Sequence, residues 1–156
     1  MATVRLDPMT DDEYDAWLEK IVPEYAADNV RSGRWAQAES VALSQASFDE
    51  LLTNGRDTAG QLLWTVRDEG GSEVGILWVA TDRRPRYAFI YDIEMDAARR
   101  GEGLGTATLT ALEEWCRANG IDSIGLHVFA HNEGAWRLYK RMGYVETDVN
   151  MEKRLA

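Results

Sequence analysis

The sequence has few of the features that mark a secreted or membrane protein. It holds one cysteine, Cys116, so no internal disulfide can form, which agrees with a reducing compartment. No apolar run approaches the roughly 18–20 residues that a membrane-spanning helix needs. The first residues, MATVRLDPMTDDEYDAW, turn acidic early and lack the apolar core of a signal peptide. We therefore expect a cytoplasmic protein.

Positive charge and soft metal ligands are also scarce. The 17 Lys and Arg residues against 27 Asp and Glu give a net charge of −10, which opposes non-specific nucleic-acid binding. The two histidines, His127 and His131, and the single cysteine do not supply an ordinary zinc site, so we expect no metal. Cys116 lies in an apolar helical run, which indicates a buried structural thiol. The local positive charge that an anionic ligand needs is available in three clusters, residues 83–86, 99–100 and 137–141.

Length and pattern favour one globular α/β domain over residues 1–156. Thr10 and Glu13 have the spacing of a helix capping box, and Pro23 is expected to separate the first helix from a second. The predicted helices cover residues 10–20, 23–33, 36–52 and 132–142, with one more between the glycine-rich stretch and Gly120. The predicted strands cover residues 3–6, 61–68, 73–82, 86–95, 123–130 and 144–155, the second and third forming a hairpin. This order predicts a mixed sheet in a layered α/β fold.

The stretch RRGEGLGTATL places Gly101, Gly103 and Gly105 directly before a helix. Glycines this close indicate a task for the backbone, and the unpaired N–H groups of a first helical turn can bind phosphate. A tight turn into the helix is the structural alternative. A P-loop is excluded because Thr106, with no lysine, follows Gly105. The dinucleotide fingerprint is excluded because no third glycine stands three residues after the second.

Two segments together resemble a known family. Arg100-x-x-Gly103-x-Gly105 after a strand resembles the pyrophosphate loop of the GNAT superfamily of acetyl-CoA-dependent N-acetyltransferases. The segment VFAHNEGAWRLYKRMGY resembles its second signature, which is matched at Asn132, Ala135, Leu138, Tyr139, Gly143 and Tyr144. AFIYDIEM, RRGEGLG and GLHVFAHN further resemble a bacterial subgroup whose acceptors are mostly unassigned. The resemblance implies the GNAT fold, a mixed sheet of about six to seven strands, splayed at the cofactor site, with helices on both faces.

The same resemblance implies that acetyl-CoA is the donor and indicates which residues bind it. The backbone of Ile93 and Met95 would pair with the pantetheine amides, and the Met95 N–H would polarise the thioester carbonyl. Asn132 and Ala135 would line the pantetheine, although helix capping alone also explains Asn132. The pyrophosphate would lie on the loop and first helical turn, formed by Arg100, Gly101, Gly103, Leu104, Gly105 and Thr106.

The expected reaction is direct transfer of the acetyl group to a primary amine through a tetrahedral intermediate. No Ser-His-Asp or Cys-His arrangement that would form an acyl-enzyme is visible in the sequence. The resemblance makes Tyr139 the general acid for the departing CoA thiolate. Without the motif, its helical spacing would be read as that of a core aromatic residue.

The acceptor amine must lose a proton, and three residues are candidates for this step. Strand alternation places Asp92 and Glu94 on one face and Tyr91, with the other odd-numbered residues, on the opposite face. We expect His127 to take the proton, because a pKa near 6.5 suits a base at neutral pH. Asp92 would attract the cationic amine, and Glu94 is the reserve base. A solvated strand face and a core histidine are the structural alternatives.

The partners that we expect are a small-molecule or peptide amine, with no nucleic acid and no membrane. Homodimer formation is left open. A module that binds acyl-CoA without catalysis is the alternative function. Thiol release from acetyl-CoA in the presence of a panel of amines would distinguish the two functions.

Overall fold

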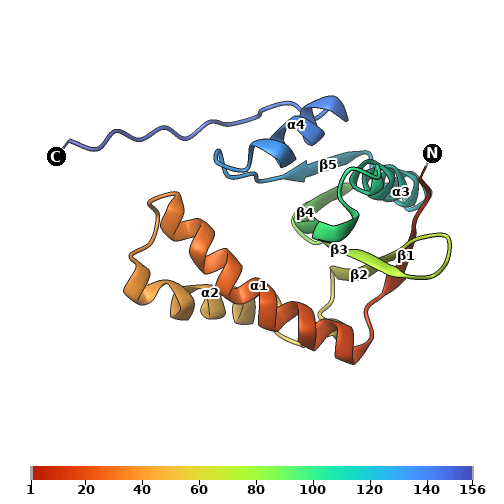
Figure 1. Cartoon of the computed structure of the whole chain (residues 1–156), viewed down its shortest axis with the longest axis horizontal. Helices are drawn as coiled ribbons and strands as arrows, with labels where there is room; N and C mark the ends of the chain where they lie inside the picture. The colour runs from red at the N-terminus through yellow and green to blue at the C-terminus, as the bar shows by residue number, and fades with distance from the viewer. Residues whose placement is uncertain (1, 156) are drawn as a thin grey trace.

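The computed structural model describes residues 2–155, and its centre is a five-stranded sheet between two pairs of helices (Figure 1). The strands are β1 (Arg5–Pro8), β2 (Gln61–Arg67), β3 (Glu73–Ala80), β4 (Tyr87–Met95) and β5 (Ser123–Leu126). They lie side by side in chain order, and only the β4–β5 pair is parallel. The sheet is therefore mixed as predicted, with five strands in place of six to seven.

Helices cover both faces of the sheet, as predicted. The four helices are α1 (Asp11–Arg31), α2 (Gln37–Leu51), α3 (Leu104–Ala118) and α4 (Glu133–Arg141), and the 3-10 turns are η1 (Gly55–Asp57) and η2 (Ala97–Arg99). One core joins α1 and α2 to the sheet through residues such as Trp17, Phe48 and Trp78. The other core joins α3 and α4 to the opposite face, and Cys116 is buried in it. Burial raises the pKa of this thiol to about 11, in agreement with a structural role.

The start of α1 is as predicted, but its predicted end is wrong. The Thr10 hydroxyl accepts from the Glu13 N–H at 3.1 Å, and the Thr10 N–H donates to Glu13 Oε1 at 3.0 Å, which completes the capping box. Pro23 does not divide the helix, which runs on to Arg31. Glu19, whose carbonyl loses its partner at Pro23, is exposed to water, as is Pro23 itself, while Val22 on the other side of the helix is buried. Packing on α2 and the sheet thus holds the helix together.

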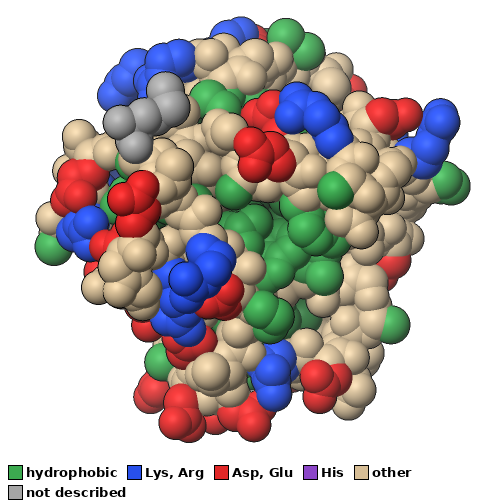
Figure 2. Space-filling model, turned by 90° about the vertical axis from the view of Figure 1, so that its right-hand side faces the viewer, with side chains coloured by type: hydrophobic (Ala, Val, Ile, Leu, Met, Phe, Trp, Pro, Cys, Tyr) green, Lys and Arg blue, Asp and Glu red, His purple; other side chains and the backbone are tan. Residues whose placement is uncertain are grey.

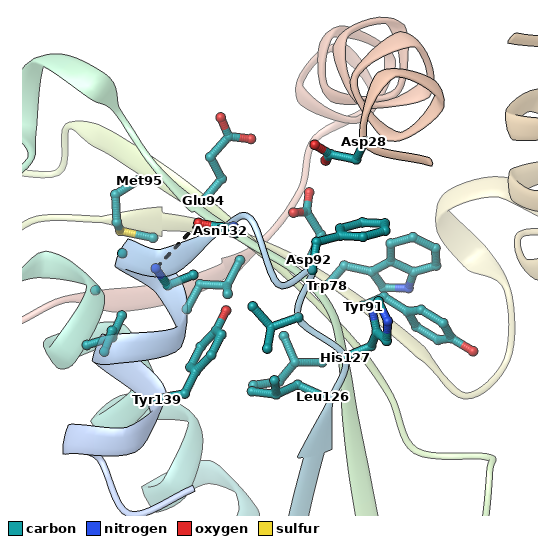
Figure 3. A pocket seen from close by; sticks show the side chains of 18 of the residues that line it. Asp28, Trp78, Tyr91, Asp92, Glu94, Met95, Leu126, His127, Asn132 and Tyr139 are labelled. Carbon is teal, nitrogen blue, oxygen red and sulfur yellow. Dashed lines mark hydrogen bonds between the residues drawn. The ribbon is translucent and has the colours of Figure 1, made fainter. Parts of the chain in front are cut away.

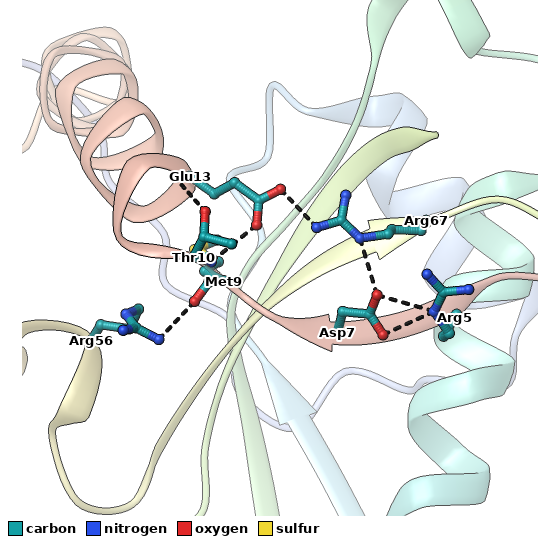
Figure 4. Close-up of polar contacts among 7 residues, drawn as sticks. All are labelled: Arg5, Asp7, Met9, Thr10, Glu13, Arg56 and Arg67. Carbon is teal, nitrogen blue, oxygen red and sulfur yellow. Dashed lines mark hydrogen bonds and ion pairs between the residues drawn. The ribbon is translucent and has the colours of Figure 1, made fainter. Parts of the chain in front are cut away.

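An ion-pair network ties the beginning of α1 to the sheet (Figure 4). Arg67 on β2 donates to Asp7 on β1 at 3.0 Å and to Glu13 on α1 at 2.8 Å. Arg5 donates to the same Asp7 carboxylate. One arginine therefore connects three elements at the corner of the sheet, and this fixes where α1 begins its path toward the cleft described below.

Three strand boundaries differ from the prediction. β1 is displaced toward Pro8, where it pairs with β2. β5 ends at Leu126 and does not reach residue 130, because its partner β4 stays beside it only as far as Ile90. Residues 144–155, predicted as a final strand, pair with no strand of the described chain and have no regular secondary structure.

Charged side chains of both signs are mixed on the face that carries α3 and β1. Figure 2 shows this face: apolar side chains gather in its middle, and Lys, Arg, Asp and Glu side chains surround them. Within residues 2–155, no helix combines the length and the apolar character needed to cross a membrane.

Candidate active site

A β-bulge in β4 changes which side chains face α1. The register of β3 and β4 shifts beside Trp78, so that Tyr91 is an extra residue between Ile90 and Asp92. Tyr91 consequently stacks on Trp78, with ring centroids 4.5 Å apart, on the side of the sheet that α1 covers. The prediction that Tyr91 faces away from Asp92 is therefore wrong, because simple alternation does not survive an inserted residue.

Beyond the bulge, β4 and β5 separate. Their parallel pairing ends at Ile90 and Leu126, while β4 continues to Met95. An open cleft of about 1130 Å³ lies between the diverging segments, above the roughly 300–1,000 Å³ typical of small-ligand sites. It is large enough for an elongated cofactor together with an acceptor.

The free edge of β4 offers backbone groups to this cleft. The Asp96 N–H donates to the Val74 carbonyl at 2.8 Å. Hydrogen bonding alternates along an antiparallel pair, so the even-numbered residues of this part of β4 bond to β3. The N–H and C=O groups of Ile93 and Met95 therefore point away from β3 and into the gap that β5 has left.

The glycine loop lies at one end of the cleft. Backbone conformation explains two of its three glycines, and close packing on α4 concerns the third. Gly101 and Gly103 have φ values of +85° and +78°, which favour glycine, and no atom lies within 4 Å of where their Cβ atoms would stand. Backbone N–H groups at the start of α3 are thus open to a ligand. Gly105 lies close to α4: a Cβ there would stand 3.1 Å from a methyl carbon of Leu138, so a larger residue would require the Leu138 side chain to shift.

Helix α4 brings Tyr139 and Asn132 to the opposite wall. Tyr139 is 8% exposed and its ring contacts that of Tyr144, with centroids 5.7 Å apart. Burial, with the negative charge of Asp92, raises the pKa of Tyr139 to about 12, so the phenol keeps its proton at neutral pH. Asn132 caps α4, its side chain accepting from the Ala135 N–H at 3.4 Å.

Carboxylates converge on the middle of the cleft from β4 and α1. Asp92 accepts from the Trp17 indole N–H at 3.0 Å, and Glu94 pairs with Lys20 at 3.0 Å, so both face α1 as alternation predicts. Burial raises the pKa of Asp92 to about 7; the Trp17 hydrogen bond opposes this rise, and the charges of Glu94 and Glu24 reinforce it.

His127 lies on the segment that follows β5. Its ring packs edge-on against Phe129, with centroids 5.1 Å apart. Burial and the positive charge of Arg34 lower its pKa below the usual 6.5, so the imidazole is neutral at pH 7 and can accept a proton. Figure 3 shows Tyr139, Asp92, Glu94 and His127 around the same opening.

Every predicted site residue borders this one cleft. They are Ile93, Met95, Arg100, Gly101, Gly103, Leu104, Gly105, Thr106, Asn132, Ala135, Tyr139, His127, Asp92 and Glu94. Their roles stay predictions. Within residues 2–155, no group of three or more His, Cys, Asp or Glu side chains is arranged to hold a metal ion.

Sequence reasoning missed the contribution of α1. Glu24, Tyr25 and Asp28 line the cleft opposite β4, and Asp28 is within 3.2 Å of His131 Nε2. The spacing of Lys20, Glu24 and Asp28 by four residues places them on one face of the helix. That spacing was a signal, but only the packing of α1 on the sheet shows that this face borders the site.

Comparison with known proteins agrees with this geometry. Residues 10–144 match the Acetyltransferase (GNAT) family. This chain belongs to that family. It is 36% identical to the uncharacterized N-acetyltransferase YdgE of Bacillus subtilis, over 97% of this chain and 98% of that protein. It is 37% identical to YycN of the same organism, over 98% and 99%.

The solved structures show the same fold. The crystal structure of the Bacillus subtilis acetyltransferase YycN superposes with a TM-score of 0.94 at 36% identity, and the match covers 99% of both chains. Some less similar relatives are longer. The mycothiol acetyltransferase of Kytococcus sedentarius is 30% identical over 91% of this chain but only 44% of its own length. The family and these N-acetyltransferase relatives identify the chain as an acyltransferase and favour an enzyme over a cofactor-sensing module.

Proposed function

We propose that this GNAT enzyme transfers the acetyl group of acetyl-CoA directly to a primary amine. The observation that carries the proposal is the splayed β4–β5 gap, which joins the glycine loop, the free β4 backbone and Tyr139 in one cleft. Acetyl-CoA supplies the activated thioester. The open space over Gly101 and Gly103 fits its pyrophosphate, and Arg100 borders the same end.

Different residues of the chain would then bind the cofactor and carry out the proton transfers. The Ile93 and Met95 backbone would align the pantetheine as an added strand, and the Met95 N–H would hold the developing oxyanion. Asn132 and Ala135 form the facing wall. Tyr139, which is protonated at neutral pH, would give its proton to the leaving sulfur.

Three residues near the centre of the cleft can bind the cationic amine or remove its proton. We assign proton removal to His127, which is neutral at pH 7, and attraction of the cationic amine to Asp92, with Glu94 in reserve. Asp92 can attract a cation above about pH 7, where its carboxyl is ionised, and Glu94 and Glu24 add to the negative potential around it. The cytoplasmic location stays a prediction.

We place the acceptor in the part of the cleft beside Asp92 and His127, and the residues that line this part restrict the class of amine. Its walls are aromatic as well as acidic, with Tyr25, Trp78, Phe89, Tyr91 and Phe129 beside Glu24 and Asp28. Two arginines also line this part of the cleft: Arg34, and Arg83, whose guanidinium lies 3.9 Å from the centre of the Phe89 ring, so the acidic side chains of α1 and β4 are what would attract a cation. The proposed acceptor is a cationic amine with an apolar or aromatic body.

Thiol release from acetyl-CoA tests this proposal. Turnover should be higher with arylalkyl and alkyl amines than with the same amines carrying a carboxylate, which the acidic wall repels. Glu24→Gln should raise the KM of the preferred amine several-fold with little change in kcat. The matched control is Glu19→Gln, on the exposed side of the same helix. No thiol release with any amine would contradict the function, whereas equal turnover of both amine types would contradict the acceptor class.

A further inference from the structure

Helix α1 contacts the two carboxylates of β4 through two different kinds of donor. The Trp17 indole N–H donates to Asp92 Oδ2 at 3.0 Å, and the Lys20 ammonium group donates to Glu94 Oε1, also at 3.0 Å. The indole is neutral and Trp17 is 5% exposed, whereas the Lys20 side chain is charged and 59% exposed. Both carboxylates border the cleft, and Figure 3 shows them on the same side of β4.

The periods of the helix and the strand bring these donors and acceptors together. Trp17 and Lys20 are three residues apart on α1, which places them on one face, roughly 4.5 Å apart along the helix axis. Asp92 and Glu94 are two residues apart on β4, which places them on one face, roughly 7 Å apart. The flexible lysine side chain spans the difference, whereas the indole is held in the aromatic cluster between α1, α2 and β3.

The two contacts have opposite effects on the negative charge in the cleft. The indole hydrogen bond lowers the pKa of Asp92 against the larger effect of burial, and it leaves the charge of the ionised carboxylate uncancelled. The hydrogen bond and charge of Glu94 raise the pKa of Lys20, so the lysine is protonated at neutral pH and its pair with Glu94 carries no net charge. Glu24 is 3.9 Å from the Lys20 ammonium group, beyond hydrogen-bond distance, so Lys20 neutralises Glu94 first.

The other titratable groups around Asp92 and the opening that it borders come from α1, β4, α4 and the segment that follows β5. They are Lys20, Glu24, Glu94, Tyr139 and His127. The neighbouring position on β3 is an uncharged tryptophan. Within this set, Lys20 is the group that is positively charged at neutral pH. It therefore controls how much negative charge this part of the cleft presents to a ligand.

We propose that α1 selects Asp92, and not Glu94, as the carboxylate that binds the ammonium group of the acceptor. Trp17 is a positioning residue, which orients Asp92 and leaves the negative charge in place. Lys20 is a specificity-determining residue, because it neutralises Glu94 and so removes that charge from the acceptor site. The inference rests on the proposed function and gives the physical reason why Glu94 is held in reserve.

Binding of 2-phenylethylamine, an arylalkyl amine, tests the role of Lys20. At pH 8.5 the Asp92 carboxyl is ionised and an alkyl amine is still mostly protonated. In calorimetry with CoA present, Lys20→Met should lower the dissociation constant about threefold, the effect of one unit charge roughly 6 Å away at the dielectric constant of water. The matched control is Arg117→Met, which removes the same charge from a pair with Glu113 outside the cleft. Equal effects of the two variants, or no effect of Lys20→Met, would overturn the inference.

A second comparison combines Lys20→Met with Asp92→Asn. Alone, Asp92→Asn should raise the dissociation constant of 2-phenylethylamine about fivefold or more, because the carboxylate that binds the ammonium group is lost. In the Lys20→Met background Glu94 is unpaired and can take over, so Asp92→Asn should raise the constant only about twofold or less. The Arg117→Met background should keep the full loss. The same loss in all backgrounds would show that Lys20 does not withdraw Glu94 from the site.

Trp17→Phe tests the positioning role. The phenyl ring still fills the aromatic cluster, but Asp92 loses the donor that favours its ionised form. The dissociation constant of 2-phenylethylamine should rise about threefold at pH 7 and return toward the wild-type value at pH 9, where the carboxyl is ionised in both proteins. Trp64→Phe, in the core on the other face of the sheet, is the control for lost packing. A loss of affinity that is equal at the two pH values would make Trp17 a packing residue.

The ionisation of Asp92 gives a readout that needs neither turnover nor a bound amine. Carbon-13 NMR of the carboxyl group should show a pKa that is higher by about half a pH unit in Lys20→Met, because a nearby cation is lost. Arg117→Met should leave this pKa unchanged. If no variant bound 2-phenylethylamine, the proposed acceptor class would be contradicted, and the pKa of Asp92 would still decide the inference. An unchanged Asp92 pKa in Lys20→Met would overturn it.

Discussion

Replacing Asp92 by Asn should stabilise the protein at pH 8 while it weakens the enzyme. The carboxyl has an ordinary pKa of 3.8 in the unfolded chain and about 7 in the fold, because burial disfavours its ionised form. Below pH 4 the group is neutral in both states. Between pH 4 and 7 the unfolded chain loses this proton and the folded chain keeps it, so wild-type stability falls as the pH rises.

The two pKa values set the size of the effect. At 1.36 kcal/mol per pH unit their difference corresponds to an upper limit of about 4 kcal/mol above pH 7. The Asp92 side chain keeps some contact with solvent, which reduces the expected gain for Asp92→Asn to about 1–3 kcal/mol. The amide oxygen still accepts from the Trp17 indole, so this hydrogen bond is retained.

Urea unfolding of both proteins at pH 4 and pH 8, followed by circular dichroism, measures the effect. The stability difference should be near zero at pH 4 and reach its full value at pH 8. Asp122→Asn is the control, since this exposed residue pairs only with an exposed Arg86 and should change stability by less than about 0.5 kcal/mol. A gain that is absent at pH 8, or equal at the two pH values, would refute the burial argument.

Three further substitutions test the assigned roles. Tyr139→Phe keeps the buried ring and removes the phenolic proton. The kcat should therefore fall by about 10²–10⁴-fold, while the melting temperature stays unchanged. A loss of twofold or less would make Tyr139 a packing residue. Gly103→Val forces a β-branched residue into a backbone conformation with φ +78°. The protein should still fold, but acetyl-CoA should no longer raise its melting temperature. Normal binding of acetyl-CoA would show that the glycine loop is not the pyrophosphate site. His127→Ala should abolish the fall of kcat below pH 6.5 in the pH–rate profile, whereas Asp92→Asn should mainly raise the KM of the amine. If only Asp92→Asn abolished this fall of kcat, the two roles would be reversed.

The sequence by itself determined the local features. The capping box at Thr10 and Glu13, the β2–β3 hairpin, the glycine loop before α3 and the N-cap Asn132 each depend on residues a few positions apart. The family signatures in the same segments were sufficient to predict a GNAT fold. They also selected residues that lie around a single cleft, because each motif lies where a strand or helix ends at the splayed edge of the sheet.

Only the tertiary structure decided what depends on distant partners. Pro23 stays within α1 because Val22 and its neighbours are packed on α2 and the sheet, a gain that no local propensity contains. The bulge at Tyr91 arises in the pairing with β3, and it changes the alternation of β4 without any signal in its sequence. β5 stops, and residues 144–155 form no strand, because a strand exists only where a neighbour supplies its hydrogen bonds.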